Sequence, residues 1–364
     1  MKKVLIYAYA NFNLGDDLFI KILCDRYPKV LFILFAPKEY KISFKDTNNL
    51  KIIPNNSIII RGINFIFRYL TMNDVCKILV AKFCDAVVTI GGSIFMQSEN
   101  WLKERNHIKR LEIKDKPRFI LGANFGPFSD PEYVTFYKQI FRESTDICFR
   151  DKYSFELFKD LSNVRLADDI VFQLNTQNSE KNIKNILISV IKPSFRKQLI
   201  NFDYLYYKKI RDIAISFIKK GYNITFISFC ESEGDKEAIE SILKTIPYDY
   251  LNSVSKHLYK FNMAATLNLI ATSEFVIATR FHSMILGWVY NKPVFPIIYS
   301  NKMINVIKDL EFKGLYTDFN KIEYLNPEEV FESMTTNIID VSKQVKNAAK
   351  QFEKLDTFLN PHAE

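Results

Sequence analysis

Short apolar runs alternate along this chain with longer segments in which apolar residues recur at helical spacing. Six runs lie in the first half, at residues 4–8, 30–35, 57–60, 86–90, 119–122 and 146–149. Runs of this length and continuity are typical of buried strands. Helical patterns, among them 17–26 and 65–83, lie between the runs. Strands that alternate with helices predict a parallel sheet with helices on both faces.

The second half repeats this alternation. Its apolar runs predict further strands at residues 186–190, 224–229, 275–278 and 294–299. Helices are predicted at 202–220, where Gly221 gives a C-cap signal, and at 236–245. The last stretch, 326–359, has the pattern of an amphipathic helix.

These patterns predict an α/β protein with two Rossmann-like domains that face each other across a cleft. We expect an N-terminal domain at 1–174 and a C-terminal domain at 185–340. The polar, Asn-containing segment 175–184 breaks the pattern and is expected to be the linker. Residues 341–364 are expected to form a C-terminal helix that packs back across the junction.

The composition is that of an ordinary soluble globular protein, with 48% hydrophobic and 25% charged residues among 364. The formal net charge of +9 favours an anionic partner, which would be a phosphate, a nucleic acid or a membrane surface. The lysines are spread along the chain, so a generally basic surface explains most of this excess. Because the basic residues form neither a stripe nor a reader motif, we expect no nucleic-acid partner.

The cysteines and the hydropathy indicate the cellular compartment. Five cysteines lie in or beside apolar runs, and no pair has zinc-knuckle spacing. We therefore expect buried thiols in a reducing compartment and no metal site. Residues 1–10 faintly resemble a signal peptide, but polar residues follow at once and a strand is expected instead. Without an apolar stretch long enough to span a bilayer, a cytoplasmic protein is expected.

The most informative candidate site follows the apolar run 275–278. Arg280, His282 and Ser283 stand there between an expected strand and an expected helix. The next strand brings Lys302 to the same rim, and ligands of open α/β sheets bind at the carboxyl ends of strands. A proton carrier between fixed cations suits an anionic substrate that must be protonated. A merely buried histidine is the alternative, which the neighbouring cations disfavour.

Two turns in the first half are further candidates. Asn13, Gly15 and Asp16 lie between the first strand and its helix. Gly15 allows a tight turn, and Asp16 either only caps the helix or also binds a ligand. After the run 86–90, Gly91 and Gly92 are suited to an anion nest, although a tight turn without function is the alternative. This pair matches neither the dinucleotide fingerprint nor the P-loop.

Arg150 comes directly after the run 146–149, so its guanidinium is expected at the same kind of rim. An arginine fork holds a carboxylate or a phosphate with two hydrogen bonds. A structural ion pair with Asp168 or Asp169 carries equal weight. These two carboxylates are suited to binding a sugar hydroxyl, but we favour the interpretation that they start a turn.

In their order along the chain, these motifs resemble those of the polysaccharide pyruvyl transferases, which put a pyruvate ketal on glycans. The resemblance spans nearly the whole chain and rests on Asn13-Leu14-Gly15-Asp16, Gly91-Gly92-Ser93-Ile94-Phe95-Met96-Gln97, Gly122-Ala123-Asn124-Phe125-Gly126-Pro127-Phe128, Arg150-Asp151-Lys152-Tyr153-Ser154, Leu166-Ala167-Asp168-Asp169, Arg280-Phe281-His282-Ser283 and Tyr299-Ser300-Asn301-Lys302. The chain departs from the family pattern at 122–125 and lacks a third glycine beside Gly91 and Gly92.

The resemblance implies a glycosyltransferase-B-like fold and phosphoenolpyruvate as the donor substrate, with no cofactor required. It implies as acceptor a hexose with two free hydroxyls, on a lipid-linked oligosaccharide or a polysaccharide precursor. We expect the donor on the C-terminal domain and the acceptor on the N-terminal domain. An acceptor linked to undecaprenyl diphosphate would bring the protein to the cytoplasmic face of the inner membrane as a peripheral protein.

By the same resemblance, His282 is the general acid, Arg150 and Lys302 bind the donor's anionic groups, and Arg61 matches another family arginine. The chemistry of the transfer adds Arg280 and Ser283 on the donor side. Asp16 or Asp168 would orient or deprotonate an acceptor hydroxyl. The remaining candidates are expected to line the acceptor site or to shape the loops around it. They are Asn13, Gly15, Gly91, Gly92 and Gln97.

Two other functions fit the same sequence. A nucleotide-sugar-dependent glycosyltransferase shares the expected fold, and cations at the rim would suit its diphosphate. A non-catalytic protein that binds a glycan or a phosphate is the second alternative, which the pairing of His282 with Lys302 disfavours.

Overall fold

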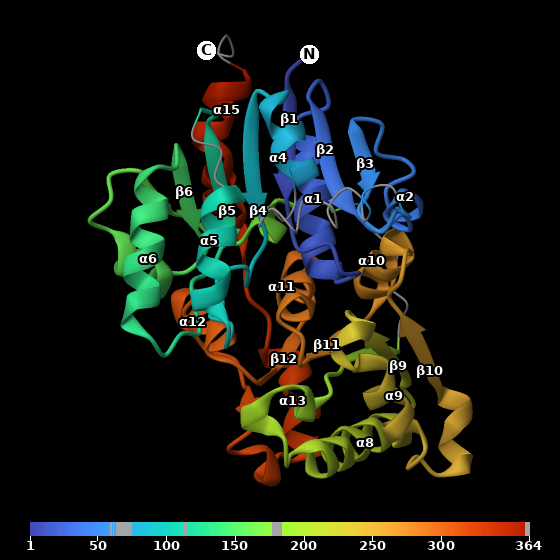
Figure 1. The fold of residues 1–364 in the computed structure, drawn as a ribbon. Coiled ribbons are helices and arrows are strands. Elements are labelled where there is room, and N and C mark those ends of the chain that lie inside the picture. Colours follow the sequence, from blue (N-terminus) through green and yellow to red (C-terminus); the bar gives the residue numbers. More distant parts are fainter. Residues whose placement is uncertain (59, 61, 63–74, 112–114, 177–183, 361–364) are drawn as a thin grey trace. The chain divides into compact units, whose positions relative to one another are not determined.

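The computed structural model describes residues 1–364 apart from 59, 61, 63–74, 112–114, 177–183 and 361–364. The chain forms two compact α/β units, each built on its own parallel sheet (Figure 1). Unit 1 comprises residues 1–11, 16–173 and 344–364, and unit 2 comprises 12–15 and 174–343. The predicted fold class of two Rossmann-like parallel-sheet domains is confirmed. Most of the expected linker lies outside the described residues.

The described part of unit 1 contains a seven-stranded parallel sheet. Its strands are β1 (Lys3–Tyr7), β2 (Leu31–Ala36), β3 (Leu50–Pro54), β4 (Ala86–Ile90), β5 (Arg118–Ala123), β6 (Asp146–Phe149) and β7 (Val164–Leu166). They lie in the order β3-β2-β1-β4-β5-β6-β7, so the chain changes direction across the sheet between β1 and β4. Loops that leave neighbouring strands on either side of such a point form a ligand site in open α/β sheets.

The helices of unit 1 connect these strands. They include α1 (Leu14–Arg26), α2 (Tyr40–Ser43), α4 (Val75–Lys82), α5 (Trp101–Leu111), α6 (Pro131–Arg142) and α7 (Lys152–Phe158). Helix α6 shows why such a segment folds: Asp130 accepts a hydrogen bond from the Glu132 amide, and Pro131 occupies the first helical position. Its inner face joins an aromatic cluster that contains Tyr137 and Phe141.

The strand predicted at 57–60 is wrong. The chain is already extended in β3, and after Pro54 it turns, so that Ile58 and Ile60 are helical. Ser57 accepts a hydrogen bond from the Ile60 amide through its hydroxyl, as an N-cap serine does. An apolar triplet is compatible with either structure, and here the cap decides for the helix.

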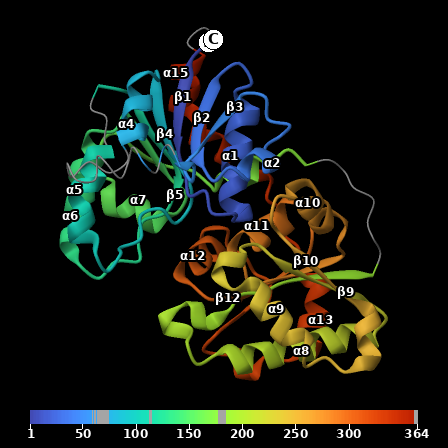
Figure 2. The same cartoon turned by 45° about the vertical axis from the view of Figure 1, so that its right-hand side comes forward.

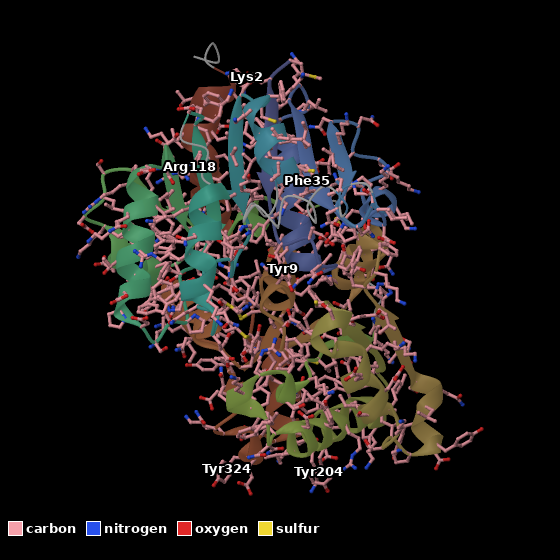
Figure 3. All side chains as sticks on the ribbon, in the orientation of Figure 1. Lys2, Tyr9, Phe35, Arg118, Tyr204 and Tyr324 are labelled. Atoms are coloured by element: carbon pink, nitrogen blue, oxygen red, sulfur yellow. The ribbon has the colours of Figure 1, made fainter. Side chains whose placement is uncertain are left out.

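The C-terminal segment belongs to unit 1 from residue 344 onward. The predicted helix 326–359 is divided into α13 (Pro327–Thr336), α14 (Ser342–Ala348) and α15 (Glu353–Leu359). Lys2, labelled in Figure 3, donates to the Phe358 carbonyl, and its Nζ lies 4.2 Å from the centre of the Phe358 ring. The last helix is thus fastened beside the first strand of the chain.

In its described residues, unit 2 contains a six-stranded parallel sheet. Its strands are β8 (Asn185–Ser189), β9 (Asn223–Ser228), β10 (Val254–Leu258), β11 (Phe275–Ala278), β12 (Val294–Ile298) and β13 (Thr317–Asp318), in the order β10-β9-β8-β11-β12-β13. Strand β10 contains His257, which the sequence analysis did not place in a strand. Since β8 lies between β9 and β11, the carboxyl ends of β9, β8, β11 and β12 follow one another along one edge.

Helices cover both faces of this sheet. They are α8 (Asp203–Lys219), α9 (Asp235–Leu243), α10 (Met263–Thr272), α11 (Phe281–Val289), α12 (Asn301–Asp309) and the already named α13. Figure 2 shows α8, α9 and α13 on one face and α10 and α11 on the other. The predicted helix 202–220 is confirmed as α8, and Gly221 follows it with a φ of +85°.

Candidate functional site

The predicted turn between a strand and a helix is present at the carboxyl edge of the unit 2 sheet. Strand β11 ends at Ala278, and helix α11 begins at Phe281, with Arg280 as its N-cap residue. His282 and Ser283 therefore stand in the first helical turn; His282 is half-buried, and Ser283 is fully buried. The backbone amides of a first turn and the helix dipole favour an anion at this place.

Lys302 lies at the same rim, as expected. It follows β12 in the first turn of α12, whose N-cap residue is Ser300. Its Nζ lies 5.6 Å from the centre of the Phe281 ring and 5.6 Å from that of Tyr299. Since Phe281 precedes the histidine in α11, the lysine and the imidazole belong to one cluster.

Arg280 is buried and engaged by two carboxylates. Its Nε donates to Asp235 at 3.0 Å, its Nη2 also donates to Asp235, and its Nη1 donates to Glu233 at 2.5 Å. Asp235, fully buried, also accepts the amides of Phe229 and Cys230 at 2.9 and 3.0 Å. This network ties the loop after β9 to the start of α11, so the geometry gives Arg280 a positioning role.

Two members of the cluster were missed by the sequence analysis. Arg196, from the loop after β8, donates through Nη2 to Glu233 at 2.8 Å, and its guanidinium carbon lies 4.4 Å from the centre of the Tyr299 ring. Glu233 thus joins Arg196 to Arg280. Neither residue belongs to a motif, and only the parallel order of β9, β8 and β11 brings their loops together.

The cations dominate the electrostatics of this rim. Burial alone would raise the pKa of Glu233, but Arg280, Arg196 and Lys302 lower it to about 2. Burial likewise raises the pKa of Tyr299, and the same cations outweigh it and bring that pKa below its usual range. The site therefore favours negative charge.

The segment Phe12–Gly15 groups with unit 2 and contributes a close contact. A Cβ on Gly15 would lie 1.6 Å from His282 Nδ1, so only glycine allows this approach of the imidazole. The Leu14 amide donates to the Phe229 carbonyl at 3.1 Å. Asn13 accepts the Gly15 amide at 3.1 Å through its side chain. Gly15 is thus needed for close packing, where the sequence analysis invoked a tight turn.

The glycine pair of unit 1 also packs against a functional candidate. A Cβ on Gly92 would lie 2.6 Å from both terminal nitrogens of Arg150. The Asn124 amide donates to the Gly92 carbonyl at 2.9 Å, and Asn124 Oδ1 accepts from Arg150 at 2.6 Å. The loops after β4, β5 and β6 are therefore held together around this guanidinium.

Arg150 forms the ion pair that the sequence left open. Its Nη1 donates to Asp169 at 2.7 Å, and both side chains are almost fully buried. The partner is Asp169, whereas Asp168 accepts a hydrogen bond of 2.8 Å from Asn347 in α14. Asp168 thus holds the C-terminal segment within unit 1.

The other acceptor-side candidates have local structural partners. Gln97 accepts the backbone amides of Ser129 and Asp130 at 2.7 and 3.1 Å, which fixes the loop before α6. Asp16 stands in the first turn of α1, and its Oδ1 lies 3.7 Å from the position of a Cβ on Gly91. The side chain before α1 that accepts an amide is that of Asn13, so the expectation that Asp16 caps this helix is corrected. Arg61 lies outside the described residues.

The chain also matches a known protein family over most of its length. The family model of the polysaccharide pyruvyl transferases matches residues 13–301. The chain belongs to this family. The match begins at Asn13 and ends directly before Lys302, so it covers both glycine turns, Arg150 and the His282 helix start. The protein is accordingly a transferase whose family acts in polysaccharide pyruvylation.

One relative of this transferase agrees with that assignment. It is 23% identical to the amylovoran biosynthesis protein AmsJ of Erwinia amylovora over 291 residues, which are 74% of this chain and 70% of AmsJ.

Solved structures show the fold. The UDP complex of S. aureus MnaA matches with a TM-score of 0.60 at 12% identity, over 100% of this chain and 98% of MnaA. Anabaena Alr3699/HepE with UDP-glucose gives 0.56 at 11% identity, over 99% and 97%. The expected glycosyltransferase-B-like fold is thereby confirmed.

Among the described residues, no helix has the length and apolarity needed to span a bilayer.

Proposed function

We propose that this transferase moves the pyruvyl group of phosphoenolpyruvate onto two hydroxyls of one hexose in a glycan, where it forms a cyclic ketal. The observation that carries the proposal is the placement of His282 in the first turn of α11, in one cluster with Lys302. A donor with a carboxylate and a phosphate fits an edge where cations and helix N-termini gather.

The reaction needs one acid and firm hold of the donor. A proton adds to the methylene carbon of phosphoenolpyruvate, and an oxocarbenium-like centre develops at C2. One sugar hydroxyl attacks C2, phosphate leaves with its bridging oxygen, and the second hydroxyl closes the ring. The two sugar hydroxyls release two protons. One replaces the proton that the acid gave to the methylene carbon, and the other leaves with the phosphate. Positioned acids and fixed cations are the means by which proteins accelerate such steps.

In this proposal His282 is the acid and Lys302 neutralises charge on the donor. Ser283 lies in the same turn of α11. Arg280 holds the turn in place through Asp235 and Glu233 and need not touch the donor. Arg150 remains a donor-binding candidate through the family resemblance, and its buried pair with Asp169 would orient it.

On the acceptor side the proposal favours Asp16 as the carboxylate that orients or deprotonates a sugar hydroxyl. Asp168 is the weaker candidate, because its side chain accepts a hydrogen bond from Asn347. The loops around Gly91, Gly92 and Gln97 would shape the acceptor's surroundings. A lipid-linked acceptor, as on undecaprenyl diphosphate, would make the protein peripheral at the cytoplasmic face of the membrane. The chemistry draws on no cofactor, since phosphoenolpyruvate is consumed as a substrate.

The test offers the purified protein phosphoenolpyruvate, UDP-glucose and GDP-mannose in parallel. Each is first tested for a rise in melting temperature, because a ligand that binds the folded state stabilises it. The donor is then incubated with hexose-containing glycans, and phosphate release and acceptor mass are recorded. We expect stabilisation by phosphoenolpyruvate and acceptors heavier by one pyruvic acid less one water. Stabilisation and turnover with a nucleotide sugar alone would establish the glycosyltransferase alternative.

A further inference from the structure

Two arginines share one carboxylate at the carboxyl edge of unit 2. Arg196 and Arg280 both pair with Glu233, and Arg280 also pairs with Asp235. Asp235 is fully buried beneath Arg280.

Arg196 differs from Arg280 in how its guanidinium is satisfied. Its Nη2 donates to Glu233, while its Nη1 is buried and, among the residues that the structure describes, has no acceptor. A buried donor without an acceptor is unfavourable, and such groups in proteins are commonly satisfied by a ligand or water. The Nη1 group of Arg196 therefore keeps a capacity to donate hydrogen bonds that none of the described residues uses.

The guanidinium of Arg196 is also held in position before any ligand arrives. The Tyr299 ring lies against it at 4.4 Å, and the bond to Glu233 fixes the opposite side of the group. An arginine that is already stacked and paired loses little conformational entropy when it binds an oxyanion.

Two helix starts at the same edge of the sheet carry hydroxyls without a hydrogen-bond partner among the described residues. Within the described part of the chain, the hydroxyls of Ser283 in α11 and Ser300 before α12 are buried and have no hydrogen-bond partner. Ser283 is 0% exposed. Donors of this kind at the starts of two helices match an oxyanion with several acceptor oxygens.

We propose that Arg196 is a donor-binding residue that contacts an oxyanion of the donor through Nη1, with Glu233 and Tyr299 as the residues that position it. For the identity of the donor this inference rests on the proposed function. The oxyanion is either the phosphate or the carboxylate of phosphoenolpyruvate, and the test separates the two.

The test compares Arg196→Gln with the wild-type protein. Removal of one charged hydrogen bond at a buried site should raise the KM for phosphoenolpyruvate by about tenfold or more, with a much smaller change in kcat. Arg196→Lys keeps the charge without the fork and should recover only part of the loss. Arg211→Gln is the matched control, because Arg211 pairs with Asp212 on the partly exposed surface of α8.

Calorimetric titrations with phosphoenolpyruvate, inorganic phosphate and pyruvate complete the test without turnover. We expect Arg196→Gln to weaken the binding of phosphoenolpyruvate and of either phosphate or pyruvate. The fragment whose affinity falls identifies the oxyanion that Arg196 contacts. Equal affinity of wild type and Arg196→Gln for all three ligands would overturn the role of Arg196 and leave the proposed function intact. If wild type binds phosphate but not phosphoenolpyruvate, the proposed function fails, and an Arg196-dependent phosphate affinity still supports the oxyanion site.

Discussion

At the scale of single residues, the contact between Gly15 and His282 is the most restrictive feature of the candidate site. The imidazole occupies the space that any side chain at position 15 would need. The sequence pointed to both residues, but for separate reasons, and nothing in either motif predicted that they touch. That contact depends on the segment Phe12–Gly15 lying against unit 2.

The contact predicts the outcome of a double-mutant cycle. Gly15→Ala should displace the imidazole, lower the free energy of unfolding and reduce turnover at least tenfold, because a misplaced acid transfers its proton poorly. In the background of His282→Ala the same substitution should cost much less stability, because the ring is gone. Urea unfolding of the four proteins measures this coupling. Equal costs in both backgrounds would show that residues 15 and 282 do not touch.

For Arg280, the motif predicted the position of the residue but not its partners. The sequence placed it correctly at the strand-to-helix turn and assigned it to the donor. Its carboxylate partners are far away in the sequence: Glu233 lies in the loop after β9, and Asp235 is the first residue of α9. A residue's place at a rim can be predicted from local pattern, whereas its pairing depends on the strand order.

At the scale of elements, Glu233 links the loops after β8 and β9 to the start of α11, and this link predicts a pH dependence of stability. Its pKa is about 2 in the folded protein against an ordinary value of 4.5. A carboxyl group whose pKa is lowered by folding stabilises the fold. Its contribution is complete at pH values above the ordinary pKa of 4.5, and it is lost as the pH falls from 4.5 toward 2. The whole contribution is at most ~3.5 kcal/mol.

The variant Glu233→Gln separates the contribution of this carboxylate from the loss of stability that the whole protein shows at low pH. It should be less stable than wild type at pH 7, and the difference should shrink as the pH is lowered through the window from 4.5 to 2. Denaturant titrations at several pH values measure it. A difference that stays constant across the window would mean that Glu233 is not held ionised by its arginines.

Elements with a strong pattern were predicted well, and weak ones were not. Helix α8 and the junction of β11 with α11 match their predictions, because their apolar spacing and end signals agree. The error at 57–60 arose because three consecutive isoleucines do not distinguish the periodicity of a helix from that of a strand. The turn after Pro54 and the Ser57 cap decide that structure locally.

At the scale of the whole molecule, the buried side chain of Gln351 is one of the groups that hold the C-terminal segment in unit 1. Gln351 accepts the Gly122 amide at 2.9 Å and donates to the carbonyls of Phe149, Ala167 and Asp168. It thus joins the carboxyl ends of β5, β6 and β7. The sequence predicted a helical C-terminal segment. It did not predict that a glutamine of this segment would form hydrogen bonds with the backbone at the ends of three strands.

Gln351→Ala should therefore lower the free energy of unfolding by at least ~2 kcal/mol, because buried backbone groups of three strands lose their partner. The control is Lys350→Ala, because Lys350 is next to Gln351 in the chain but is exposed. Chemical denaturation monitored by circular dichroism provides the comparison. If both variants unfold like wild type, Gln351 does not hold the segment in place.

The measurement that tests the central claim most directly is the rate at which His282→Ala releases phosphate from phosphoenolpyruvate in the presence of an acceptor glycan. The account predicts a loss of roughly a hundredfold or more, as for removal of a general acid. The melting temperature should stay close to that of wild type. His257→Gln serves as the control, because His257 bonds to Thr266 within unit 2 and takes no part in the proposed reaction. A His282→Ala protein that turns over at the wild-type rate would contradict the account.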